Sequence, residues 1–158
     1  MNYSDKVILA LDSSDIKENL SLINELVPPI KIVKIGPVSF LPNAKKLIEE
    51  IQKTDCTVMF DFKFFDIPNT IIESLRFLFD INTKIFTVHC LAGQRTIASV
   101  MKKINELDKQ IADEINSKGI KDANYLGRPE VFGVTILTSF DNEQLKSIGL
   151  EFPSVSAS

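Results

Sequence analysis

Short apolar runs alternate along the chain with longer stretches in which apolar residues recur three or four positions apart. The short runs are rich in β-branched residues, and such alternation is typical of repeated βαβ units built around a parallel sheet. The sequence therefore predicts an α/β fold with five strands. The predicted strands begin at Lys6 (KVILALD), Lys31 (KIVKIG), Cys56 (CTVMFDFK), Lys84 (KIFTVHC) and Val131 (VFGVTILTS).

The stretches between these runs predict amphipathic helices, because their apolar residues fall on one face at helical spacing. Pro68 suits the first turn of one of them, where its missing N–H is not needed. The longest carries an apolar stripe from Ile97 to Ile115, with most of its charges elsewhere. The predicted helices cover 16–26, 44–51, 71–79, 97–115 and 142–148.

The composition is that of a globular domain with modest charge. Of the 158 residues, 44% are hydrophobic and 25% charged, and the formal net charge is -3 with no long run of one sign. This excludes the basic surface that nucleic-acid and anionic-membrane binders share, so we expect a small molecule or another protein as partner. No apolar run approaches the roughly 20 residues of a membrane span, and the run near the N-terminus is too short for a signal peptide. We therefore expect a cytoplasmic protein.

The two cysteines support the same compartment. Cys56 and Cys90 stand alone, each inside an apolar run. Isolated cysteines in such runs are typical of reduced core thiols in cytosolic proteins, not of a disulfide or zinc framework. We predict no metal site.

Polar residues interrupt the predicted strands at or near their C-terminal ends. In parallel barrels and open sheets, ligands bind where the carboxyl ends of the strands meet. A set of polar groups repeated at that rim therefore predicts an active site. The residues are Asp12, Lys34, Asp61, Lys63 and His89, with Thr138 and Ser139 in the corresponding place on the fifth strand.

The densest group of such residues lies in the segment 61–70, DFKFFDIPNT. Side chains two apart on a strand share a face, so Asp61 and Lys63 are expected to form an ion pair, and Lys34 from the neighbouring strand could complete a Lys-Asp-Lys arrangement. At an effective dielectric near 20, two charges about 4 Å apart interact by roughly 4 kcal/mol. Both lysines are therefore expected to stay protonated, which makes Lys63 a candidate acid.

This segment resembles the orotidine 5'-phosphate decarboxylase family, whose motif is Asp-x-Lys-x-x-Asp-Ile-Pro-Asn-Thr. Further short segments agree in the same order, and the resemblance extends over about 7–150. It implies a (β/α)8 TIM-barrel fold, and a conversion of orotidine 5'-monophosphate to UMP and CO2 without metal or cofactor. The supporting segments are ALD ending at Asp12, VKIG around Lys34, VH ending at His89 and VTILTS ending at Ser139.

The resemblance also implies a role for each site residue. Lys63 would donate a proton to C6 of the pyrimidine, Asp61 would lie beside the substrate carboxylate, and Lys34 would orient Asp61 and contact the ribose. Asp12 would bind a ribose hydroxyl, and Thr138 would contact the pyrimidine. Residues of the loop and helix after the third strand would serve the partner subunit's site, so a homodimer is expected. These are Asp66, Ile67 and Thr70.

Two alternatives remain open from the sequence. Sugar-phosphate decarboxylases and synthases of the same superfamily share Asp-x-Lys-x-x-Asp but use magnesium, and the segment 67–70 (IPNT) argues against them. The other alternative is a truncated remnant of the enzyme, or a fragment of it, without activity. A complete barrel needs eight βα units and about 200 residues or more, whereas five are predicted in this chain.

We therefore assign residues 1–150 to the N-terminal part of a single TIM-barrel domain and 151–158 to a tail. Five parallel strands without closure leave two edges open, which favours association. We expect the isolated chain to be marginally stable or to need a partner, with little activity.

Overall fold

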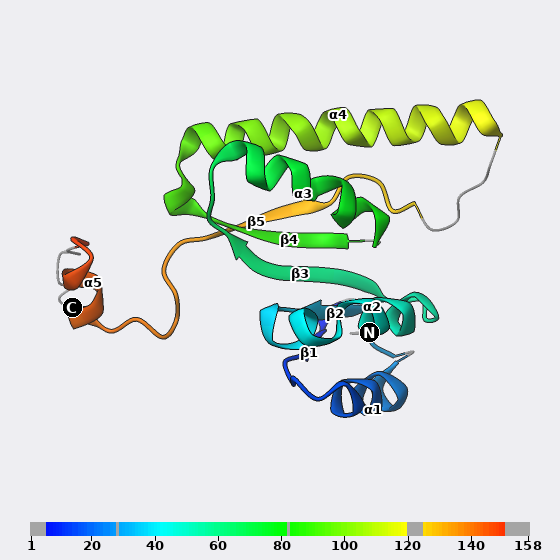
Figure 1. Ribbon diagram of the computed structural model, residues 1–158, viewed down its shortest axis with the longest axis horizontal. Helices are drawn as coiled ribbons and strands as arrows, with labels where there is room; N and C mark the ends of the chain where they lie inside the picture. The colour runs from blue at the N-terminus through cyan, green and yellow to red at the C-terminus, as the bar shows by residue number, and fades with distance from the viewer. Residues whose placement is uncertain (1–5, 28, 82, 120–124, 151–158) are drawn as a thin grey trace.

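Figure 1 shows the computed structural model, which describes residues 6–27, 29–81, 83–119 and 125–150. A five-stranded parallel sheet lies at its centre in the order β1-β2-β3-β4-β5. Each strand pairs with the strand that precedes it in the chain, as expected for consecutive βαβ units. The strands are β1 (Ile8–Leu11), β2 (Ile32–Ile35), β3 (Thr57–Phe64), β4 (Thr83–His89) and β5 (Glu130–Val134).

Helices follow the strands in alternation, so the five predicted strands and five predicted helices are all present. Pro68 stands at the start of the third helix, as predicted. The fourth helix is the longest and runs along the outside of the sheet (Figure 1). The helices are α1 (Ile16–Leu26), α2 (Pro37–Gln52), α3 (Pro68–Asp80), α4 (Gln94–Lys118) and α5 (Asn142–Ser147), with a short 3-10 turn, η2 (Cys90–Ala92), after β4.

The core lies between the sheet and helices α1 to α4. Leu11, Ile35 and Phe86 occupy one level across β1, β2 and β4, and all three are fully buried. The helices cover them with apolar residues spaced three or four apart, which is the pattern that predicted the helices. Buried helix residues include Leu47 on α2, Ile71 and Leu75 on α3, and Val100 and Ile104 on α4.

The fifth strand is shorter than the sequence predicts. β5 ends at Val134, and Thr138 and Ser139 lie in a turn beyond it. The chain then leads away from the sheet to α5 (Figure 1). Because β5 is an edge strand, its extension has a neighbour on one side only, and β4 ends at His89, opposite Val134. The prediction that Thr138 stands on a strand was therefore wrong.

Within the described part of the chain, no helix is both long enough and apolar enough to cross a lipid bilayer. Residues 151–158, which we assign to a tail, lie outside the described residues.

Candidate active site

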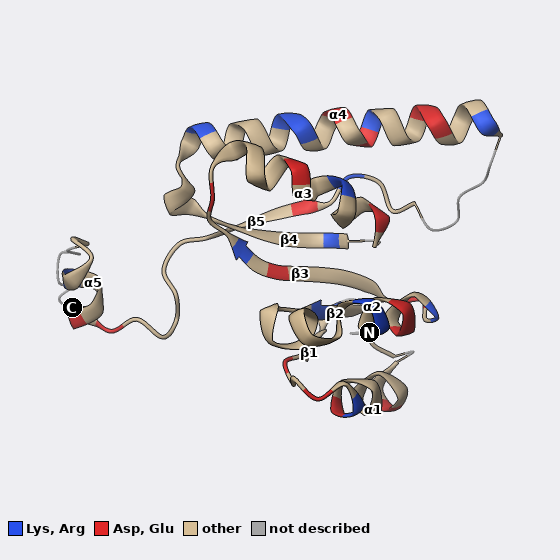
Figure 2. Ribbon diagram, in the orientation of Figure 1, with Lys and Arg blue, Asp and Glu red and all other residues tan. Residues whose placement is uncertain are grey.

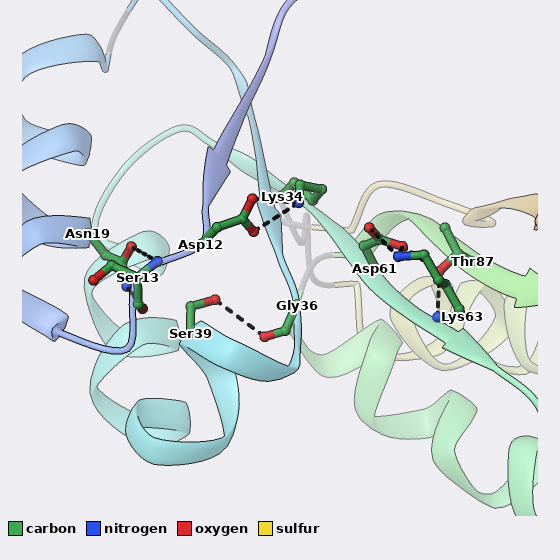
Figure 3. A network of polar contacts seen from close by, with 9 residues as sticks. All are labelled: Asp12, Ser13, Asn19, Lys34, Gly36, Ser39, Asp61, Lys63 and Thr87. Carbon is green, nitrogen blue, oxygen red and sulfur yellow. Dashed lines mark hydrogen bonds and ion pairs between the residues drawn. The ribbon is translucent and has the colours of Figure 1, made fainter. Parts of the chain in front are cut away.

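The carboxyl rim of the sheet carries two ion pairs, both between residues that the sequence singled out. On β3, the Nζ of Lys63 lies 3.0 Å from each carboxylate oxygen of Asp61. Between the first two strands, the Nζ of Lys34 lies 2.9 and 3.0 Å from the two carboxylate oxygens of Asp12. Figure 3 shows both pairs, with Lys34 reaching from β2 to the residue that follows β1. The predicted Asp61–Lys63 pair is confirmed as a contact.

The Lys-Asp-Lys arrangement is not formed within ion-pair distance among the described residues. Lys34 pairs with Asp12, and the carboxylate of Asp61 is occupied by Lys63 and by the hydroxyl of Thr87. Register does not decide between the two carboxylates, because Lys34 lies opposite Ala10 on β1 and opposite Met59 on β3, two residues before Asp12 and Asp61 respectively. The difference is that the Asp61 carboxylate already has two partners.

The two pairs differ in exposure. The Asp61 side chain is 15% exposed and that of Lys34 is 24% exposed, whereas Asp12 and Lys63 are 60% and 41% exposed. Each pair thus joins a shielded charge to one that reaches solvent. Away from this rim, most charged residues lie on the helices. β3, by contrast, carries an acidic and a basic residue near its carboxyl end (Figure 2).

The opposite face of β3 is a ladder of aromatic rings. Phe60 and Phe62 stack with their ring centroids 4.0 Å apart, and Phe64 continues the row. Phe40 of α2 packs edge-on against the first two. Since alternate side chains leave a strand on opposite faces, these three phenylalanines hold Asp61 and Lys63 on the other face.

The loop that carries Asp12 is fixed by the side-chain amides of Asn19 and Asn43. Asn19 is fully buried; its side chain donates to the carbonyl of Ser13 and accepts the Ser13 N–H (Figure 3). Asn43 of α2 donates to the carbonyl of Ser14. These bonds hold the turn after β1 without using the Asp12 side chain, which stays available at the rim.

The residues predicted to serve a partner subunit lie on the surface after β3. Asp66 accepts the N–H of Ile67 at 2.6 Å, and Ile67 is the N-cap of α3 with 67% of its surface exposed. Thr70 is also exposed, in the first turn of α3. Among the described residues, no ion pair or side-chain hydrogen bond joins these three to Asp61 or Lys63.

His89 and Arg128 have structural contacts. The Nδ1 of His89 accepts the N–H of Leu91, and its ring packs on Phe65 at 5.5 Å. Arg128 precedes β5, at the end of the sheet opposite the site, and donates to Asn105. Within the described part of the chain there is no group of three or more His, Cys, Asp or Glu that could hold a metal ion.

The sequence analysis missed Thr87. Its hydroxyl lies inside β4 and touches both members of the Asp61–Lys63 motif. The signal was a polar residue within the apolar run KIFTVHC, but β-branched threonine is ordinary in a strand.

The fold and this rim of charged side chains define a protein of the (β/α)8-barrel class, of which the described residues supply five βα units. The model of the orotidine 5'-phosphate decarboxylase / HUMPS family matches residues 5–155. The chain belongs to that family.

Relatives agree with this assignment, and a solved structure agrees with the fold. The chain is similar to the orotidine 5'-phosphate decarboxylases of Syntrophomonas wolfei, at 31% identity over 92% of this chain and 56% of the relative, and of Carboxydothermus hydrogenoformans, at 29% identity over 94% and 56%. The crystal structure of the orotidine 5'-phosphate decarboxylase from Lactobacillus acidophilus superposes with a TM-score of 0.70 at 23% identity, covering 90% of this chain and 58% of that one. The chain thus spans about half the length of the curated relatives it matches.

Proposed function

We propose that this chain carries the catalytic half-site of an orotidine 5'-phosphate decarboxylase, which converts orotidine 5'-monophosphate to UMP and CO2. The observation that carries the proposal is the ammonium of Lys63, held at 3.0 Å from both oxygens of Asp61 at the carboxyl rim. The names of the relatives support the same substrate.

The bond that breaks joins C6 of the pyrimidine to its carboxylate carbon. The electron pair stays on C6, CO2 leaves, and the Lys63 ammonium gives a proton to C6, after which the neutral amine recovers a proton from solvent. A fixed cation beside a developing carbanion stabilises the transition state electrostatically, most strongly where water is excluded. Asp61 would lie beside the substrate carboxylate and keep Lys63 in place.

The remaining roles follow the resemblance in the sequence. Asp12 and Lys34 would bind the ribose; their mutual ion pair supports a joint role and replaces the expectation that Lys34 orients Asp61. The resemblance also gives Thr138 a contact with the pyrimidine, but this residue lies in a turn beyond β5, and no interaction among the described residues joins it to Asp61 or Lys63. No metal or cofactor takes part in the proposed reaction.

We propose a homodimer in which Asp66, Ile67 and Thr70 complete the partner's site. Their exposure on the first turn of α3 and the preceding loop supports this, because residues that serve another subunit must reach the surface. Subunit mixing tests it. Mixing inactive Lys63→Ala with inactive Asp66→Ala should restore part of the turnover, and no restoration would contradict a shared site.

The second candidate is a chain that keeps half a site without turnover. This candidate is favoured by the part of each relative that the chain matches, which is 56% of the relative's length. Binding energy from remote parts of a substrate can be used at the reacting centre, so a site without its full set of contacts loses rate as well as affinity.

Turnover of orotidine 5'-monophosphate, followed by absorbance with and without a chelator, tests these readings. Metal-independent release of CO2 that Lys63→Ala abolishes, with UMP affinity still measurable, supports the decarboxylase. Near-normal turnover by Lys63→Ala contradicts the assigned role. A chain that binds UMP without turnover fits the second candidate, and a magnesium requirement with sugar phosphates would point to the other branch of the superfamily.

A further inference from the structure

The third strand departs from regular geometry opposite Thr87. Phe60 pairs with Phe86 and Phe64 pairs with Val88, so three residues of β3 face one residue of β4. Lys63, inside this irregular stretch, has φ 47 and is the one non-glycine residue with positive φ in the described part of the chain. A left-handed conformation is unfavourable for an L-residue other than glycine, so surrounding contacts must hold it.

The hydroxyl of Thr87 supplies those contacts. It accepts the backbone N–H of Lys63 at 2.8 Å and donates to Oδ1 of Asp61 at 2.9 Å (Figure 3). The direction is fixed, because an amide N–H can only donate and an ionised carboxylate can only accept. Thr87 is 3% exposed, so water cannot readily replace either bond.

The same hydroxyl therefore holds the backbone of one charged residue and the side chain of the other. The backbone bond fixes where the Lys63 side chain leaves the strand, and the carboxylate bond fixes where Asp61 receives the ammonium. The N–H of Lys63, displaced from the regular ladder by the irregularity, finds its acceptor in a side chain instead of a strand carbonyl.

We propose that Thr87 is a positioning residue that sets the geometry of the Asp61–Lys63 pair by binding both residues through one hydroxyl. Its effect on turnover rests on the proposed function, but its effect on the structure of the pair does not. Thr87 touches no reacting atom in this scheme; it acts through Lys63 and Asp61.

A matched control lies on the same strand. Thr83 is also 3% exposed, and its Oγ1 has no hydrogen-bond partner among the described residues. Replacing either threonine by valine keeps the β-branched shape and removes the hydroxyl. A difference between the two variants therefore reports the bonds of Thr87, not the packing of β4.

The experiment compares Thr87→Val, Thr87→Ser and Thr83→Val in two ways. The first is hydrogen exchange of the Lys63 amide by NMR, which needs no turnover. We expect exchange to accelerate by about tenfold or more in Thr87→Val, as for loss of a hydrogen bond worth roughly 1.5 kcal/mol, and to stay near the wild-type rate in the other two.

The second measurement is turnover of orotidine 5'-monophosphate. A misplacement of about 1 Å in a catalytic group can cost on the order of 100-fold in rate, so kcat should fall by about that factor in Thr87→Val with a smaller change in KM. Thr87→Ser should recover most of the loss. If the wild-type chain has no turnover, the proposed function fails while the exchange measurement still decides the role of Thr87.

The proposal would be overturned if the Lys63 amide exchanged at the same rate in Thr87→Val as in the wild type. Equal losses in Thr87→Val and Thr83→Val would also overturn it, because they would trace the effect to packing. Should Thr87→Val not fold, the alanine variants at both positions provide the same comparison, with the same result expected and the same result contradicting it.

Discussion

The ammonium of Lys34 lies 2.9 Å from Oδ1 of Asp12, so a residue inside β2 is tied to the residue that follows β1. Asp12 is 60% exposed, and exposed ion pairs contribute little to stability, typically below about 1 kcal/mol. A pair of this kind at a sheet rim is well placed to bind a ligand hydroxyl, because its carboxylate can accept one further hydrogen bond. The Asp12–Lys34 pair is therefore expected to contribute more to the affinity for a ligand than to the free energy of unfolding.

Asp12→Asn should accordingly weaken the binding of UMP by about tenfold or more, as expected for losing a charged hydrogen bond of roughly 1.5–3 kcal/mol. The free energy of unfolding should change by less than about 1 kcal/mol. Titration calorimetry with UMP and urea unfolding measure the two. Glu49→Gln breaks another exposed pair, with Lys45 on α2, and should leave UMP affinity unchanged. If Asp12→Asn and the wild type bound UMP with equal affinity, the assignment of Asp12 to the ribose site would be contradicted.

The effect of the left-handed backbone at Lys63 can be measured by comparing two substitutions that both remove the ammonium. Glycine adopts φ 47 freely, whereas a β-branched residue at that φ is strongly disfavoured. Lys63→Val should therefore unfold at lower urea than Lys63→Gly, with a difference of at least about 1 kcal/mol. Equal stability of the two variants would mean that position 63 relaxes to an extended conformation.

The two thiols should react at different rates. Burial raises the pKa of the Cys56 thiol above its ordinary value, and the thiolate is the reactive form. Cys56 is 7% exposed and Cys90 is only partly buried. Iodoacetamide should therefore modify Cys90 first, as read by peptide mass spectrometry, and denaturant should remove the difference. In Cys90→Ser, labelling of the native chain should be slow; rapid labelling of that variant would contradict the prediction.

Tyr125 connects the chain before β5 to α4. Its hydroxyl donates to the carboxylate of Asp108, and burial together with this bond raises the pKa of Tyr125 above its ordinary value of 10.0. Because the folded state favours the neutral phenol, this contribution to stability is complete below pH 10 and is lost as pH rises above it.

Tyr125→Phe should therefore flatten the fall of the unfolding free energy with pH in the alkaline range. Urea unfolding at neutral and alkaline pH measures it. Tyr3 lies outside the described residues, so Tyr3→Phe serves only to correct for the titration of a second phenol in the unfolded chain. Parallel pH curves for Tyr125→Phe and wild type would contradict the prediction.

The two outer strands of the sheet each have one unpaired edge among the described residues. Phe132 on β5 is 46% exposed, and an apolar edge strand favours pairing with another chain. We expect the 158-residue chain to associate with increasing concentration, and Phe132→Lys to reduce that association. Sedimentation velocity reports it. A wild-type chain that stays monomeric over the whole range would contradict the expectation.

Local pattern was enough for most of the fold. Short apolar, β-branched runs predicted the five strands, and helical spacing of apolar residues predicted the five α-helices of the described residues. The same reasoning brought Asp61 next to Lys63, since residues two apart on a strand share a face. These are properties that a short stretch of sequence carries by itself.

What the sequence could not predict depends on contacts between distant residues. The positive φ of Lys63 depends on a hydroxyl 24 residues away, and lysine itself gives no sign of it. Lys34 pairs with Asp12 and not with Asp61, whose carboxylate is contacted by Lys63 and by the distant Thr87. Thr138 was placed on a strand because VTILTS is a good strand sequence, yet β5 ends at Val134, where the pairing with β4 stops.

The sequential order of the sheet has a consequence for how the chain is made. In the described order β1-β2-β3-β4-β5, each strand after the first pairs with the one synthesised just before it, so it finds a partner that is already made. Each pairing spans a single βα unit, the shortest connection that parallel strands allow, although parallel sheets as a class fold slowly. The sheet can thus grow strand by strand during translation, and Thr87 reaches the Asp61–Lys63 segment as soon as β4 is made.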